Sequence, residues 1–279
     1  MSLVEVTDLH RVFRMRHSIS DVIAVNKVSF SIESGEAVGL VGESGSGKST
    51  IARILLGLEH ADSGSAVIDG DDRLTPAHGR TKRMRRARTV QMVFQDPNGT
   101  LDRHLSVDET LRRALKAHHM MPSSRETESR VAELLDRVRL TKQQGKSKPH
   151  ELSGGQRQRI AIARALALEP KLVVLDEAVS ALDVSVQAQI LELLAEIQRD
   201  SDVSYLFVSH DLAVIQQLCQ RSLVLFRGSL VEQGNTTQVL SHPQHPYTKL
   251  LVASTPGPGW KPDKVVQSRK EFNELMAFS

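Results

Sequence analysis

The sequence predicts an α/β fold in which a parallel sheet carries polar residues at the ends of its strands. Three observations support this fold class. Residues 37–41 form a short apolar run, a glycine-rich segment follows, and residues 50–58 then have helical periodicity. Two further apolar runs, 171–175 and 205–208, lead into acidic or histidine residues, and helical patterns lie between the runs. Because parallel sheets bind ligands at the carboxyl ends of their strands, we expect the functional site there.

The segment between the first strand and helix has the spacing G-x-x-x-x-G-K-S, which is typical of a phosphate-binding loop. Its glycines permit backbone conformations and close approaches that a side chain would block. Its N–H groups would then form an anion nest at a helix N-terminus. Lys48 would reach the β- and γ-phosphates and the Ser49 hydroxyl a Mg²⁺ ion. The flanking strand and helix argue against a chance glycine-rich turn. The residues expected to contact nucleotide here are Gly42, Glu43, Ser44, Gly45, Ser46, Gly47, Lys48, Ser49 and Thr50.

The composition is that of a globular protein: of the 279 residues, 40% are hydrophobic and 25% charged, and the net charge is +3. No apolar run approaches the roughly 20 residues that cross a bilayer. The N-terminus lacks the pattern of a signal peptide. Cys219 is the only cysteine, which excludes an intrachain disulfide and a cysteine-based metal cluster. These features fit the cytoplasm.

Two N-terminal segments, 3–12 and 22–32, alternate like strands around a polar loop at 14–21. Phe13 could stack on an adenine ring or serve as a core aromatic, and the sequence leaves both open. The basic cluster at 80–88 could bind nucleic acid. We favour the exposed face of a short helix, because no aromatic residues interleave to stack on bases.

The middle of the chain turns helical after a strand at 90–94. Apolar spacing predicts helices between residues 105 and 140, within a helical insertion of about 96–152. Residues 223–232 predict a hairpin. A short helix is expected after Pro246, and a tail of uncertain order from Thr255 onward.

Several polar residues follow these predicted elements. Ser153 is placed to cap a helix whose first turn contains Gly154 and Gly155, a second anion-binding device. Asp176 suits a Mg²⁺-holding carboxylate, and Glu177 could polarise an attacking water. His210 could donate to a γ-phosphate. The alternatives are strand-end caps and a structural histidine, but a structural protein has no need for so many apt residues at strand ends.

With these motifs the chain resembles the ATP-binding subunits of ABC transporters, over about residues 3–251. Residues 152–156 match the family signature, Gln95 the Q-loop, 180–183 the D-loop and His210 the H-switch, in the family's order. The stretches 181–189 and 242–248 are similar to the peptide and nickel importer subfamily.

The resemblance implies a P-loop NTPase core of the RecA-like type, with an N-terminal antiparallel β subdomain and an α-helical insertion that carries the signature. The ATPase domain would span 1–250, with its core at about 1–95 and 160–240 and the helical subdomain at about 96–159. Residues 251–279 would form a C-terminal tail.

The resemblance also implies ATP and Mg²⁺ as cofactors and two ATPase domains that dimerise head to tail. We expect a heterodimer, with a homodimer as the alternative, together with two membrane permease subunits and, indirectly, an extracytoplasmic solute-binding protein. No nucleic acid is expected. The chain would lie peripherally on the cytoplasmic face of the inner membrane and energise uptake of peptides, nickel or similar small solutes. The alternative is a non-transport ATPase in a soluble complex, associated with phosphonate breakdown or nucleic acid.

Specific roles follow from the same resemblance. The catalytic residues would be Glu177, His210, Gln95 and Lys48, and the metal ligands Ser49, Gln95 and Asp176. Nucleotide would also contact residues outside the phosphate loop, namely Phe13, Gln95, Ser153, Gly154, Gly155, Gln156, Asp183 and His210.

Overall fold

The computed structural model describes residues 2–14, 21–120 and 123–255, and from the C-terminal segment residues 263, 265, 266, 268–270 and 272. The predicted loop at 14–21 and most of the predicted tail therefore lie outside the described residues. The chain divides into two compact units, one formed by residues 33–35 and 75–205 and the other by 2–32, 36–74 and 206–279. We call them the helical unit and the phosphate-loop unit. The predicted subdomain boundaries at 96–159 stay a prediction.

The phosphate-loop unit contains two groups of strands. In the first, the strand order is β2-β1-β4-β5, and β1 pairs antiparallel with β4 from Val4 opposite Ile68 to His10 opposite Ser63. In the second, β9 pairs antiparallel with β10 and parallel with β3, and β8 follows β3 in the order. The predicted antiparallel N-terminal strands and the C-terminal hairpin are thus confirmed. The strands are β1 (Ser2–Phe13), β2 (Val22–Glu33), β3 (Ala37–Val41), β4 (Ser63–Ile68), β5 (Asp71–Asp72), β8 (Ser204–Ser209), β9 (Arg221–Phe226) and β10 (Ser229–Asn235).

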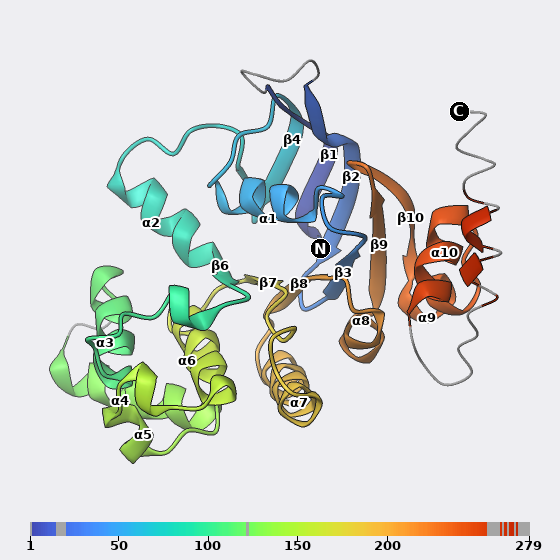
Figure 1. Ribbon diagram of the computed structural model, residues 1–279. Helices are drawn as coiled ribbons and strands as arrows, with labels where there is room; N and C mark the ends of the chain where they lie inside the picture. The colour runs from blue at the N-terminus through green and yellow to red at the C-terminus, as the bar shows by residue number, and fades with distance from the viewer. Residues whose placement is uncertain are drawn as a thin grey trace. The chain divides into compact units, whose positions relative to one another are not determined.

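Helices complete this unit: α1 (Lys48–Leu56), α8 (Leu212–Leu218), α9 (Thr236–Ser241) and α10 (Pro246–Ser254). Figure 1 shows α9 and α10 together beside β10. Every residue of β3 is buried, as the uninterrupted apolar run predicts. A Cβ at Gly39 would meet the side chains of Ile215 and Cys219, so this glycine lets α8 approach the strand closely.

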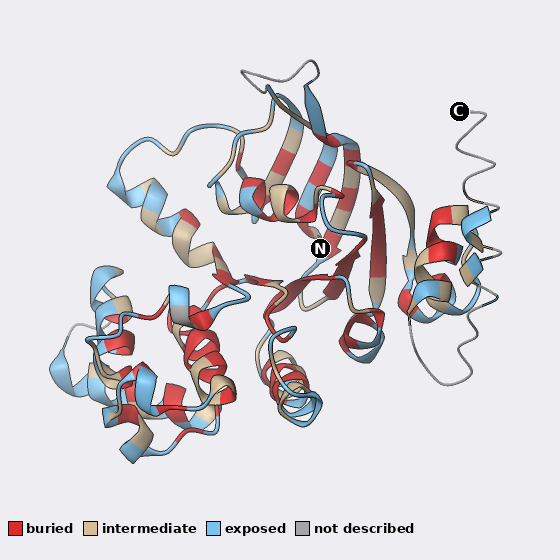
Figure 2. Cartoon of the chain, viewed as in Figure 1, coloured by how far each residue is buried: buried red, intermediate tan, exposed pale blue. Residues whose placement is uncertain are grey.

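The helical unit pairs β6 (Val90–Val93) with β7 (Leu172–Asp176) in parallel, from Val90 opposite Leu172 to Val93 opposite Leu175. Figure 2 shows that α6 is buried along most of its length. The predicted apolar positions of α3 and α4 are buried, which confirms the helical periodicity. The helices of this unit are α2 (Arg80–Thr89), η1 (Pro97–Gly99), α3 (Val107–Ala117), α4 (Ser124–Arg137), α5 (Lys142–Lys146), η2 (Pro149–Glu151), α6 (Gly154–Leu166) and α7 (Val184–Asp200).

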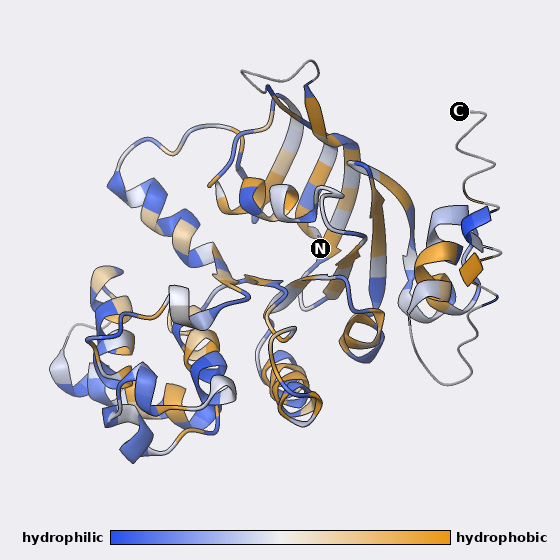
Figure 3. Ribbon diagram, in the orientation of Figure 1, coloured by the Kyte–Doolittle hydropathy of each residue, from blue (hydrophilic) through white to orange (hydrophobic). Residues whose placement is uncertain are grey.

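The basic cluster at 80–88 forms helix α2, and Figure 3 shows that α2 is largely hydrophilic. Arg80, Arg83 and Arg85 are exposed, as expected for a solvated face. Arg86 departs from that expectation: it is buried, and its guanidinium donates a 2.7 Å hydrogen bond to the Thr75 carbonyl. The sequence cannot reveal this exception, because the acceptor is a backbone carbonyl in the preceding loop.

No helix among the described residues combines the length and the apolar character needed to cross a membrane.

Candidate functional site: a phosphate loop and a signature helix

The glycine-rich segment forms a loop between β3 and α1, as predicted. Gly47 is the N-cap of α1, at φ +105°, and no side chain caps the helix. A Cβ at Gly47 would collide with the Ala24 carbonyl oxygen, and one at Gly42 with the Leu225 carbonyl oxygen. The loop therefore needs glycine for space as well as for its backbone angles. The N–H groups in the first turn of α1 lack intrahelical partners, and together with the helix dipole they favour a phosphate group.

Lys48 lies inside this loop, 6% exposed. Its ammonium group donates to the carbonyls of Gly42 at 2.7 Å and Glu43 at 2.8 Å, and to the Ser46 hydroxyl at 3.4 Å. These contacts hold a positive charge within the loop itself. A glycine-lined cradle that contains one buried cation fits the phosphates of a nucleotide.

Distant segments of the same unit hold the phosphate loop. The Gly228 N–H donates to the Ser46 carbonyl at 3.0 Å, and the Asn26 N–H donates to the Gly228 carbonyl at 2.8 Å. The Glu43 N–H donates to the Tyr247 hydroxyl at 2.9 Å, although the two residues are 204 positions apart. No local pattern in the sequence links these residues to the loop, so the sequence does not predict their contacts with it.

Two further predicted nucleotide contacts belong to the phosphate-loop unit. His210 is exposed at the C-terminal end of β8, and Asp211 caps α8 through a bond from the Ala213 N–H. Phe13 ends β1 and is half-buried, with the Arg11 guanidinium 4.8 Å from its ring centroid. Phe13 is therefore not a fully buried core aromatic, and its stacking on adenine stays a prediction.

In the helical unit, the signature residues form the start of α6. Ser153 is the N-cap and accepts a hydrogen bond from the Gln156 N–H, while the Gln156 side chain accepts one from the Ser153 N–H at 2.9 Å. The predicted cap is thus confirmed and is a full capping box. Ser153 is exposed, whereas Gly155 is buried. The amide oxygen of Gln156 is engaged within this helix, so the cap gives Gln156 a structural role beside its predicted nucleotide contact.

The D-loop packs against this helix start. A Cβ on Gly155 would clash with the Val186 side chain in α7, and one on Gly154 would lie 3.6 Å from Leu182. Asp183 is the N-cap of α7, with no capping bond from its side chain. The signature and the D-loop therefore form one packed element.

Gln95 joins the same cluster, because its side-chain amide donates to the Ser180 hydroxyl at 3.3 Å, and that hydroxyl donates to the Glu177 carbonyl at 3.0 Å. A cavity of about 250 Å³ lies among these motifs. Its lining residues are Gln95, Asp96, Pro97, Gly154, Arg157, Gln158, Ala181 and Leu182. The helical unit thus brings together the Q-loop, signature and D-loop predicted from the sequence.

Asp176 is the last residue of β7 and Glu177 follows it, and both are half-buried. Glu177 has φ +48°, a left-handed conformation that costs a non-glycine residue about 1–2 kcal/mol. Strained residues of this kind are frequent at functional sites. Among the described residues, no three histidine, cysteine or acidic side chains cluster around a possible metal position. The Asp176 carboxylate at the end of β7 suits Mg²⁺, which proteins bind through one or two carboxylates and a substrate's phosphates rather than in a closed cage.

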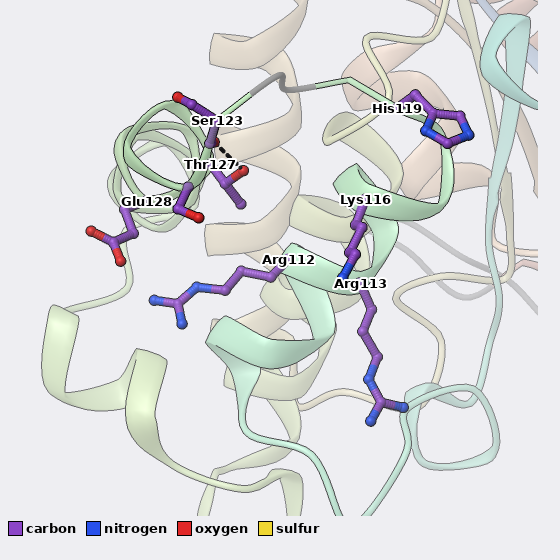
Figure 4. Close-up of a pocket in the computed structure, with 8 residues that line it drawn as sticks. Arg112, Arg113, Lys116, His119, Ser123, Thr127 and Glu128 are labelled. Atoms are coloured by element: carbon purple, nitrogen blue, oxygen red, sulfur yellow. Dashed lines mark hydrogen bonds between the residues drawn. The ribbon is translucent and has the colours of Figure 1, made fainter.

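A cavity of about 720 Å³ lies elsewhere in the helical unit, between α3 and α4. None of the predicted site residues lines it. Figure 4 shows Arg112 and Arg113 extending from α3 in different directions, with a hydrogen bond between Ser123 and Thr127 at the start of α4. The side chains do not converge on one point, as they would in a site built for one anion.

Comparison with known proteins gives two family matches. Residues 25–180 match the family model described as ABC transporter, and residues 231–278 match the C-terminal region of oligopeptide/dipeptide transporters. The chain is 46% identical over 236 residues to the glutathione import ATP-binding proteins GsiA of Shigella flexneri and of Escherichia coli strain K12. The match covers 85% of this chain but spans only 37% of the length of each relative.

Solved structures agree with the fold. The ATP-binding cassette MJ0796, in a dimeric post-hydrolysis state bound to ADP and phosphate, is 28% identical with a TM-score of 0.73, over 84% of this chain and 98% of that one. The protein cbiO1 of Clostridium perfringens, part of the transporter complex cbiONQ, is 27% identical with a TM-score of 0.75, over 86% of this chain and 91% of that one. The predicted α/β fold of the P-loop NTPase type is therefore confirmed.

Proposed function

Because the chain belongs to the ABC transporter family, we propose that it is the ATP-hydrolysing subunit of an importer for peptides or similar small polar solutes. The observation that carries this proposal is the phosphate loop itself, in which Gly42 and Gly47 leave no space for a Cβ and Lys48 is buried. The match of residues 231–278 to oligopeptide/dipeptide transporters supports the solute class, as do the glutathione import relatives. Nickel is a minor extension of the same proposal.

The phosphate loop would bind the β- and γ-phosphates of ATP through its N–H groups and Lys48. Mg²⁺, when bound, neutralises phosphate charge, and Ser49, Asp176 and Gln95 are the residues we propose to hold it. Glu177 would accept a proton from the attacking water, and His210 would donate a hydrogen bond to the γ-phosphate.

We propose that a second ATPase domain completes the site. The exposed Ser153 stands at the N-terminus of α6, where N–H groups and the helix dipole favour an anion. In a head-to-tail dimer, Ser153 and Gly155 of one subunit would face the γ-phosphate bound by the other. Hydrolysis would then remove the charge that joins the two subunits, and the dimer would reopen. The dimeric state of the cassette MJ0796 supports this arrangement. We favour an unlike partner, with a second copy of this chain as the alternative.

The direct test is hydrolysis of MgATP by the purified protein. We expect Glu177→Gln to bind ATP but to turn over about 10²–10⁴-fold more slowly, the usual contribution of general-base catalysis. Glu192→Gln is the matched control, because it makes the same chemical change on an exposed carboxylate of α7 and should leave the rate unchanged. Equal rates for Glu177→Gln and the wild type would remove Glu177 from the mechanism.

The transport role requires a different experiment. Co-purification in detergent with integral permease subunits, and ATP-driven uptake of a peptide by the reconstituted assembly, would support the importer. Assembly into a soluble complex without permease subunits would support the alternative ATPase. In the importer, the chain would lie on the cytoplasmic face of the membrane only through its permease partners.

A further inference from the structure

The phosphate loop receives a hydrogen-bond partner from the C-terminal helix. Tyr247, the second residue of α10, is 1% exposed, and its hydroxyl accepts a 2.9 Å hydrogen bond from the Glu43 N–H. Glu43 is the second residue of the loop that we propose to bind ATP. The hydroxyl thus satisfies a backbone donor at the point where the chain leaves β3 and begins to turn.

The Tyr247 ring is fixed by its neighbours. It packs on Phe226 at 4.4 Å between ring centroids and lies 5.9 Å from the Phe272 centroid. Its backbone N–H donates to His245 Nδ1 at 3.1 Å, which caps α10. The Glu232 carboxylate of β10 in turn accepts the N–H groups of Gln244 and His245, each at 2.9 Å. A ring held on several sides gives its hydroxyl a defined position.

The same ring connects the two supports of the loop. Phe226, on which Tyr247 packs, ends β9, and the next turn places the Gly228 N–H 3.0 Å from the Ser46 carbonyl. The loop is therefore held near its start by Tyr247 and near its end by Gly228, and these two supports are packed together. Burial raises the pKa of the Tyr247 phenol and outweighs the hydrogen bond from the Glu43 N–H, which acts to lower it. The hydroxyl therefore stays neutral.

We infer that Tyr247 is a positioning residue for nucleotide binding, and that the C-terminal segment thereby sets the affinity of the phosphate loop for ATP. This inference rests on the proposed function. It gives the segment matched to oligopeptide/dipeptide transporters a role within the ATPase site that its sequence pattern alone does not suggest.

The test is Tyr247→Phe, which removes one oxygen atom and keeps the packed ring. We expect KM for MgATP, and the Kd of a fluorescent ATP analogue, to rise about three- to tenfold, the range that corresponds to the net contribution of one hydrogen bond. The kcat should change less than twofold, because Tyr247 does not touch the reacting atoms. Amide hydrogen exchange in the peptide covering 40–48 should become faster.

Tyr205→Phe is the matched control. Tyr205 is also fully buried, and its hydroxyl donates a 3.1 Å hydrogen bond to the Leu194 carbonyl in the helical unit. Tyr205→Phe should lose comparable stability without raising KM for MgATP and without faster amide hydrogen exchange in the peptide covering 40–48. If Tyr247→Phe binds ATP as tightly as the wild type and exchanges at the same rate, the inference is wrong. If the folded wild type itself does not bind ATP, the proposed function fails instead.

Discussion

The phosphate loop and the signature helix both present N–H groups at a helix N-terminus, but they are stabilised in opposite ways. The start of α1 has no side-chain cap, and its loop depends on Ala24, Leu225, Gly228 and Tyr247, which lie far from it in sequence. The start of α6 has a complete capping box between residues three positions apart. An anion site with an internal cap is stable without its ligand, whereas the uncapped loop relies on surrounding backbone for its shape.

This difference predicts the largest effects for substitutions in the phosphate loop that would collide with backbone atoms far from it in sequence. Gly47→Ala combines a left-handed backbone with a collision against the Ala24 carbonyl oxygen. We expect a loss of more than about 3 kcal/mol in the free energy of unfolding and no measurable binding of ATP. Denaturant unfolding and binding of a fluorescent ATP analogue measure the two effects.

Gly57→Ala is its control, because Gly57 has φ +72° but no atom within 4 Å of a built Cβ. It should cost only about 1–2 kcal/mol of stability and leave ATP binding intact. Similar losses for the two variants would show that backbone angle, and not the remote carbonyl, decides the effect.

A smaller effect is expected inside the helical unit. Gly155→Ala would press on the stiff Val186 side chain, and we expect a loss of about 1–3 kcal/mol. Gly154→Ala places its Cβ at an ordinary distance from Leu182 and should change stability by less than about 0.5 kcal/mol. Thermal unfolding of the pair tests whether α7 packs tightly against the signature; equal midpoints would contradict the contact between Gly155 and Val186.

Ser153→Ala should cost about 1 kcal/mol of stability, because it removes an N-cap. Thr141→Ala removes the equivalent cap of α5 in the same unit and should cost a similar amount. Only Ser153→Ala should also lower the ATPase rate, if Ser153 faces the nucleotide of a partner subunit. A parallel fall in activity for both variants would assign the loss to stability alone.

The last expected effect depends on pH. Although burial acts to raise the pKa of Glu232, hydrogen bonds from the N–H groups of Gln244 and His245 help to lower it below its ordinary value. A lowered pKa in the folded state adds stability above the unfolded-state pKa, and this stability is lost as the pH falls through the folded value. Glu232→Gln should thus destabilise the protein near neutral pH by less than about 1.5 kcal/mol. The difference in free energy of unfolding between wild type and variant should become smaller as the pH falls, because the wild type loses this contribution. A gap that stays constant with pH would contradict this sign.

The sequence predicts the parts of the fold and site whose causes are local. The apolar run of β3, the helical spacing of α3 and the cap at Ser153 each arise from a few neighbouring residues. The contact between Tyr247 and Glu43 bridges 204 positions and leaves no local pattern. Arg86 was expected on a solvated face for the same reason, since only the folded loop brings the Thr75 carbonyl to it.

We propose that the phosphate loop binds ATP within one subunit and that the signature acts only on the nucleotide of its partner. The most direct measurement is the Kd of a fluorescent ATP analogue for dilute, folded Lys48→Ala and Ser153→Arg proteins, beside the ATPase rates of the same variants in the assembled complex. We predict that Lys48→Ala loses binding and activity, while Ser153→Arg keeps wild-type binding and loses activity. If Ser153→Arg weakens binding by the dilute protein as much as Lys48→Ala does, or keeps full activity in the complex, the account is wrong.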